Sequence, residues 1–112
     1  MKDCLLNKEK ISKINFFSIS PQLKEVDLSK NRDIDDFSFL IKLLTKAKHV
    51  SKLILADMSL NKNMLNNIKI GNLCKYLEII DLSNNCLYDC HDFLNDLFVG
   101  PINMTTLVLK NC

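Results

Sequence analysis

Cysteine and histidine are the residues of this 112-residue chain whose side chains could bind a metal or act as nucleophiles. Cys86, Cys90 and His91 lie close together in the sequence and offer three soft ligands. A structural zinc site usually has four ligands, often as two spaced pairs, and the chain has no second pair near these residues. We therefore expect no metal site, and we expect His91 to be a partly buried structural histidine on a helix.

Other catalytic arrangements are also missing from the sequence. The acidic residues form no pair whose spacing suits general acid–base catalysis. The chain has no glycine-rich phosphate loop and no nucleophile elbow. We therefore predict that the protein is not an enzyme and needs no cofactor.

Composition and charge are those of an ordinary globular protein. Hydrophobic residues make up 47% and charged residues 25% of the chain. The formal net charge of +2 is too weak to favour binding to nucleic acid or to an anionic membrane. No apolar stretch is long enough to span a bilayer, and the first residues lack the apolar core of a secretory signal. The five cysteines are an odd number, which fits reduced thiols, so we expect an intracellular and most plausibly cytoplasmic protein.

The dominant pattern is an internal periodicity of 27 residues. Apolar residues occupy positions 1, 4 and 6 of four segments that align without gaps, namely residues 23–31, 50–58, 77–85 and 104–112. Alternation of apolar residues at positions 4 and 6 predicts a strand with one buried face. Successive strands are then expected to stack in parallel, about 4.8 Å apart.

The residue at position 9 of each segment follows the predicted strand. It is Asn31, Met58, Asn85 or Cys112. An asparagine amide here can satisfy backbone groups of the turn in which the chain leaves the strand. A cysteine can do so only weakly and a methionine cannot.

The segments between the strands have helical patterns. Residues 35–48 begin with acids and end with lysines, which suits the helix dipole. Their apolar residues Phe37, Leu40, Ile41 and Leu44 have the spacing of one helix face. Residues 89–98 have a similar pattern, in which Phe93, Leu94, Leu97 and Phe98 are apolar. Residues 61–72 are rich in asparagine, and we expect a short or frayed helix there.

This pattern resembles the leucine-rich repeat, Leu-x-x-Leu-x-Leu-x-x-Asn/Cys-x-Leu, over nearly the whole chain. The 27-residue period resembles the longer, ribonuclease-inhibitor-like class. Departures are Asp33 in place of the next leucine of the first copy, Met58 in place of asparagine or cysteine, and a fourth copy that stops at Cys112. The resemblance implies an α/β fold, a segment of a right-handed α/β horseshoe solenoid with parallel strands on the concave face and helices on the convex face.

The same register divides residues 1–112 as a single repeat array. Residues 23–49, 50–76 and 77–103 are full repeats, and residues 104–112 are an incomplete last repeat. Residues 1–22 are either a partial repeat or an N-terminal cap. Two alternatives stay open: the chain is a fragment of a longer protein, or it is a complete small protein. The strand expected in residues 104–110 would be an uncovered edge, so self-association through it is possible.

The resemblance makes the concave strand face the expected binding surface. Its outward residues occupy positions 3, 5 and 7 of the repeats: Glu25, Asp27, Ser29, Lys52, Ile54, Ala56, Ile79, Asp81, Ser83, Thr106, Val108 and Lys110. Mixed charge around an apolar seam, without a basic stripe or stacking aromatics, suits a protein partner better than a nucleic acid.

We therefore predict a non-catalytic protein–protein interaction module of unidentified partner. The alternative implied by the resemblance is a regulatory segment of a GTPase activator of the Ran type or of a ubiquitin-ligase substrate receptor of the F-box type. Four strands of about five residues give a face of only about 300 Å², whereas a stable interface buries about 800 Å² on each partner. The partner must therefore also contact loops or further repeats.

Overall fold

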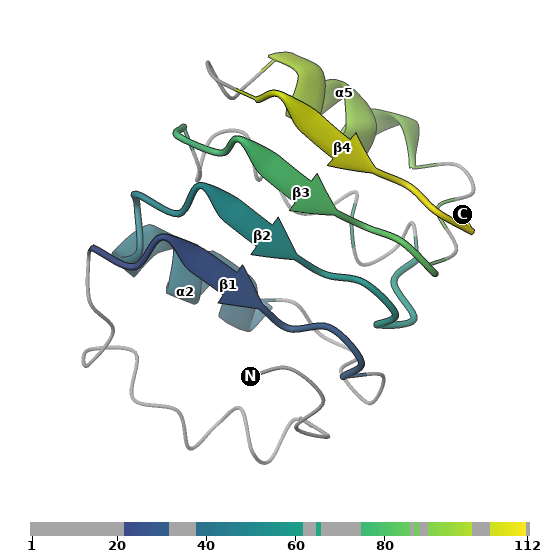
Figure 1. The fold of residues 1–112 in the computed structure, drawn as a ribbon, viewed down its shortest axis with the longest axis horizontal. Coiled ribbons are helices and arrows are strands. Elements are labelled where there is room, and N and C mark those ends of the chain that lie inside the picture. The colour runs from purple at the N-terminus through teal and green to yellow at the C-terminus, as the bar shows by residue number, and fades with distance from the viewer. Residues whose placement is uncertain are drawn as a thin grey trace.

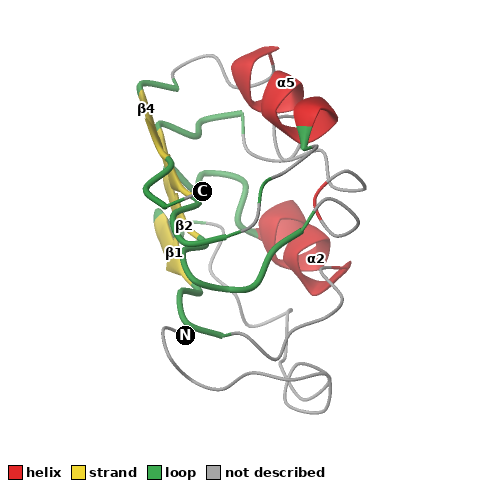
Figure 2. Ribbon diagram, turned by 90° about the vertical axis from the view of Figure 1, so that its right-hand side faces the viewer, coloured by secondary structure: helices red, strands yellow, loops and turns green. Residues whose placement is uncertain are grey.

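The chain forms a two-layered α/β structure with a parallel sheet. The computed structural model describes residues 22–31, 38–61, 65, 75–85, 87, 90–99 and 104–111. Its elements are β1 (Glu25–Asp27), α2 (Ser38–Lys46), β2 (Lys52–Ile54), β3 (Ile79–Asp81), α5 (His91–Val99) and β4 (Thr106–Val108). The four strands form one sheet in the order β1-β2-β3-β4 (Figure 1). Figure 2 shows that α2 and α5 lie on the same face of this sheet.

The strand register pairs residues that are 27 positions apart. Glu25 pairs with Lys52, Lys52 with Ile79 and Ile79 with Thr106, all in parallel. The predicted parallel stacking of the four segments is therefore confirmed. Backbone hydrogen bonds continue the pairing beyond the strands, as in the bond from the Leu28 N–H to the Ile54 carbonyl at 2.9 Å.

The core lies between the sheet and the helices. Positions 4 and 6 of the first three segments point into it and are at most 7% exposed: Val26, Leu28, Leu53, Leu55, Ile80 and Leu82. Position 1 adds Val50 and Leu77, both fully buried. The alternation of the sequence therefore separates a buried face of the sheet from the opposite face, as predicted.

The two helices bury the residues that recur at helical spacing. In α2 these are Leu40, Leu43 and Leu44, and Ala47, directly after the helix, continues the same buried stripe. The prediction that Ile41 belongs to the inward face is wrong, because Ile41 is 37% exposed. The inward stripe runs through i, i+3, i+4 and i+7 from Leu40, and this rotation of the helix leaves Ile41 at its rim.

The other predicted segments are described to different extents. In α5, Phe93 and Leu97 are buried and Leu94 is partly exposed. The predicted helix over residues 61–72 lies mostly outside the described residues, although Leu65 is helical and buried. The predicted cap or partial repeat of residues 1–22, apart from Gln22, also lies outside them, and so does Cys112.

Asn85 holds the third turn to the second, and its amide explains how Met58 is accommodated. The Asn85 Oδ1 accepts hydrogen bonds from the backbone N–H groups of Met58 and Leu60, at 2.9 and 3.1 Å. Its Nδ2 donates to the carbonyls of Leu55 and Leu82, at 2.8 and 2.9 Å. The prediction that asparagine at position 9 satisfies backbone groups of the turn is confirmed. Met58 makes no such amide contact, but its side chain fills the core at 0% exposure.

Asn31 plays the same role in the first turn. Its Nδ2 donates to the carbonyls of Leu28 and Ser29, at 2.8 and 3.3 Å. Each turn also contains a left-handed residue at position 8, with φ values of 63°, 55°, 60° and 57° at Lys30, Asp57, Asn84 and Asn111. Asparagine and aspartate tolerate this conformation well, whereas lysine does so less readily.

Candidate functional site

The candidate site is the outer face of the sheet, which we define as the face opposite α2 and α5 (Figure 2). The register arranges its predicted binding residues in rows that cross the strands. One row is Glu25, Lys52, Ile79 and Thr106, and the next is Asp27, Ile54, Asp81 and Val108. Every residue of these two rows is at least partly exposed. The structure therefore brings eight of the predicted residues together on one continuous surface.

The third predicted row, at position 7, is less accessible than the other two. Ser29 and Ser83 are each only 5% exposed, so their side chains offer little surface to a partner. The Ser29 Oγ donates to Asp27 Oδ1 at 2.6 Å, and the Ser83 Oγ accepts from the Lys110 N–H at 3.1 Å. Both hydroxyls are therefore engaged within the fold. Ala56 is partly exposed and Lys110 is exposed, which leaves these two at the rim of the face.

The charged residues of the first row form a weak pair. Lys52 Nζ lies 3.8 Å from Glu25 Oε1, and the two side chains are 43% and 56% exposed. A solvent-exposed pair of this kind adds little to folding stability. Both side chains can therefore rearrange at low cost to meet charges on a partner.

Three aliphatic side chains surround Asp81 on the outer face. Ile54 and Val108 are its direct neighbours on β2 and β4, and Ile79 lies two residues earlier on the same strand. All four residues are partly exposed. An apolar patch with one carboxylate in its centre can bury an apolar group of a partner and accept a hydrogen bond from it.

The two aspartates of the second row differ in their local hydrogen bonds. The Asp81 Oδ1 accepts the Ser83 N–H at 3.0 Å, which forms the same Asx turn as Asp27 with Ser29. Asp27 Oδ1 also accepts the Ser29 hydroxyl at 2.6 Å, whereas the Ser83 Oγ accepts the Lys110 N–H. Asp81 Oδ1 therefore accepts one hydrogen bond from its turn, whereas Asp27 Oδ1 accepts two, which leaves the Asp81 oxygen more capacity to accept a hydrogen bond from a partner.

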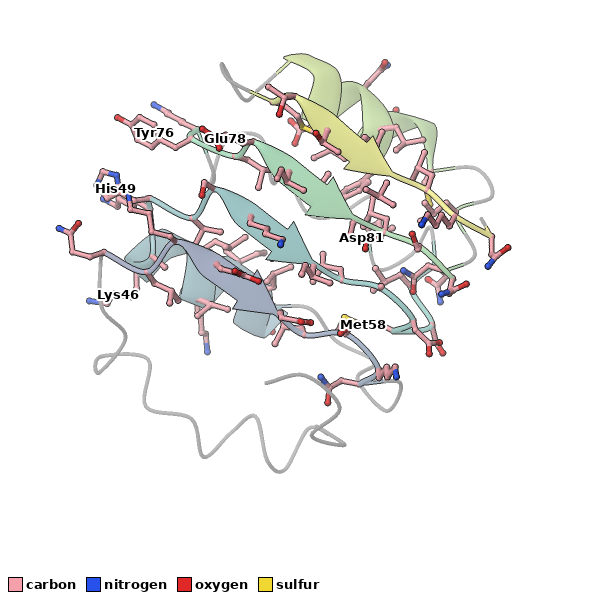
Figure 3. All side chains as sticks on the ribbon, in the orientation of Figure 1. Lys46, His49, Met58, Tyr76, Glu78 and Asp81 are labelled. Carbon is pink, nitrogen blue, oxygen red and sulfur yellow. The ribbon has the colours of Figure 1, made fainter. Side chains whose placement is uncertain are left out.

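A stacked ring pair lies at the edge where the strands begin. The ring centroids of His49 and Tyr76 are 5.2 Å apart and the ring planes are inclined by 23°. Both side chains are exposed, Tyr76 by 52%. Figure 3 shows the two rings side by side with Glu78 close to Tyr76. Sequence analysis did not identify this pair, although its signal was present: the two residues are 27 apart and each directly precedes a repeat start.

Of Cys86, Cys90 and His91, the structure describes the side chain of Cys90 alone. Cys90 is a buried thiol at 1% exposure and is not in a disulfide. Cys86 and the side chain of His91 lie outside the described residues. Within the part of the chain that is described, no group of three or more histidine, cysteine or acidic side chains could hold a metal ion.

Two further findings bear on function. None of the helices in the described ranges has the length and apolar character needed to cross a membrane. Comparison of the chain with known protein families, with curated proteins and with solved structures finds no match.

Proposed function

We propose that this chain is a non-catalytic protein-binding module built as a leucine-rich repeat array of the longer, ribonuclease-inhibitor-like class. The repeat assignment is supported by a sheet register of 27 residues across all four strands. It is also supported by position-9 asparagines that bond the turns and by helices that cover one face of the sheet (Figure 2).

The binding face in this proposal is the outer face, and the patch around Asp81 is the observation that carries it. Ile54, Ile79 and Val108 remain partly exposed although inward residues of the same strands, such as Leu53 and Ile80, are fully buried. The patch fits a partner that presents an apolar side chain together with an N–H or ammonium donor for the Asp81 carboxylate.

The contact surface extends to the His49–Tyr76 pair. The strand face alone offers about 300 Å², whereas a stable complex buries about 800 Å² per partner. Tyrosine is enriched at interface centres because it gives a large contact area with little loss of conformational entropy. Tyr76 lies three residues before Ile79 at the start of β3, so one partner can cover both the ring pair and the apolar patch.

The test is a quantitative capture experiment on extracts of the cells that make the protein. The baits are the native chain, an Ile54→Lys variant and an Ile41→Lys variant as matched control. Ile41 is exposed and Ile54 is partly exposed, but Ile41 lies on α2, on the other side of the sheet. We expect one or more partners to bind the native chain and the control equally, and to bind Ile54→Lys at least about tenfold more weakly. Equal recovery with all three baits would contradict the proposal.

A further inference from the structure

Tyr76 presents a half-exposed aromatic ring just before β3. One side of the ring stacks on His49, with the ring centroids 5.2 Å apart. Tyr76 is nevertheless 52% exposed, so its accessible area lies on the ring edge and on the side away from His49. The stack holds the tyrosine ring in place and leaves part of its π-system open to a further planar or cationic group.

The side chain of Glu78 lies beside this ring (Figure 3). Its backbone is fixed on both sides, because the Glu78 N–H donates to the Ser51 carbonyl at 2.8 Å and the Glu78 carbonyl accepts the Thr105 N–H at 2.9 Å. The residue is exposed, and within the described residues its carboxylate forms no ion pair and no hydrogen bond. A negative charge is therefore anchored next to Tyr76 and open to a donor from outside the chain.

In the described part of the sheet, the neighbouring segments supply no counter-charge for this carboxylate. Ser51 and Thr105 occupy the same repeat position on either side of it, and their side chains are uncharged. The adjacent row differs, because Glu25 there has Lys52 at 3.8 Å. Lys75 is exposed, but among the described residues it forms no ion pair with the carboxylate. The carboxylate is therefore complementary to a cationic group of a partner.

We propose that Tyr76 and Glu78 form a subsite for an arginine side chain of the protein partner, an inference that rests on the proposed function and names the chemistry of that partner. A guanidinium group is planar, so it stacks on the tyrosine ring while it donates two parallel N–H groups to the carboxylate. A lysine ammonium lacks the planar fork. An uncharged aromatic side chain would stack on the ring but leave the carboxylate without a counter-charge.

The subsite is continuous with the apolar patch of the outer face. Ile79 follows Glu78 in the chain and is partly exposed. At about 3.3 Å per residue, Asp81 lies about 10 Å from Glu78 along β3. Two residues of an extended peptide that are two positions apart have Cα atoms about 7 Å apart, and the length of an arginine side chain covers the remaining distance. The expected partner segment therefore combines one arginine with a nearby aliphatic residue.

The test is a nuclear magnetic resonance titration of the full chain with two capped tripeptides, Leu-Gly-Arg and Leu-Gly-citrulline. Citrulline has the shape of arginine but no charge. We expect the arginine peptide to shift the ring signals of Tyr76 and the amide signal of Glu78, with a dissociation constant at least about fivefold lower than that of the citrulline peptide. The net charge of the chain is +2, so general attraction does not favour the cationic peptide.

Three variants assign the preference to the subsite. Glu78→Gln should remove the preference for arginine over citrulline, because the amide carries no charge. Tyr76→Leu keeps an apolar side chain without a π-system and should weaken binding of the arginine peptide at least about threefold. Asp92→Asn is the matched control, since it removes one carboxylate from an exposed position of α5 on the other side of the sheet, and it should leave the preference unchanged. Circular dichroism of each variant verifies that the fold is retained.

Equal affinity for the two peptides would overturn the inference, and so would a preference for arginine that Glu78→Gln leaves intact. Absence of any shift at Tyr76 and Glu78 up to about 10 mM peptide would also overturn it, because a complex with a dissociation constant of about 1 mM is nearly saturated there. The capture experiment with Ile54→Lys changes neither residue of the subsite, so the arginine subsite can fail while the proposed binding face stands.

Discussion

Replacing Asn85 with alanine should be among the most destabilising single changes in the described part of the fold. The side chain is 4% exposed. Its Oδ1 accepts the N–H groups of Met58 and Leu60 from the preceding turn, and its Nδ2 donates to carbonyls of both turns. Alanine would leave two buried N–H groups without their acceptor and would open a small cavity.

The magnitude follows from the hydrogen bonds that are lost. A net hydrogen bond contributes about 1 kcal/mol, and a buried donor without a partner costs about 1–3 kcal/mol. For the two N–H groups and the carbonyls together we expect a loss of about 3–5 kcal/mol. Since domains of this size have unfolding free energies of about 5–15 kcal/mol, the variant should be close to the limit of stable folding.

The assay is urea unfolding followed by far-ultraviolet circular dichroism. Asn95→Ala on the exposed side of α5 is the control and should change the free energy of unfolding by less than about 0.5 kcal/mol. Asn85→Leu restores most of the volume but no hydrogen bonds, and it should be destabilised nearly as much as Asn85→Ala. If Asn85→Ala lost less than about 1 kcal/mol, the role assigned to this amide would be refuted.

Three further predictions concern the strands, the turns and the ring pair. Leu53→Asp should abolish folding because it buries a charge, whereas Ile54→Asp should leave the circular dichroism spectrum and the urea midpoint nearly unchanged; equal loss of helix signal in both would contradict the register. Lys30→Asn should raise the free energy of unfolding by about 0.5–1 kcal/mol, because Lys30 has a φ of 63° and asparagine tolerates this left-handed conformation better than lysine. The control is Lys48→Asn, at an exposed turn residue outside the left-handed region, which should leave the free energy of unfolding unchanged. Tyr76→Ala should reduce partner capture by about tenfold and change the urea midpoint little, since the ring is 52% exposed, and a partner bound with unchanged affinity would exclude the ring pair from the interface.

The sheet was predictable because its signal repeats. Apolar residues at positions 4 and 6 recur every 27 residues. Because all four strands share this pattern, the four copies together support one register, and a shift by one residue would turn the apolar side chains of every strand to the wrong face. The turn asparagines were predictable for a related reason. Asn31 and Asn85 occupy the same position of the repeat, directly after a buried strand, where a side-chain amide can hydrogen-bond the backbone of the turn.

Features that depend on the rotation of one element were not predictable to the same degree. Ile41 belongs to the stripe that begins at Phe37 but not to the stripe that begins at Leu40. Packing of α2 against the sheet buries the second stripe and leaves Ile41 exposed. Ser29 and Ser83 follow their strands at an outward position of the repeat, but both are buried and their hydroxyls are hydrogen-bonded within the fold. The His49–Tyr76 stack joins two loops rather than two strands, so the apolar alternation that predicts the strands carries no signal for it.

The most direct test of the proposed binding face is methyl nuclear magnetic resonance on the isoleucine- and valine-labelled chain, titrated with the partner recovered by capture. The account predicts that the Ile54, Ile79 and Val108 signals shift or broaden. The signals of Ile80, on the inner face of β3, and of Ile41, on α2, should stay in place. Shifts confined to Ile41, or no change at the three outer-face residues, would contradict the claim that this face of the sheet binds the partner.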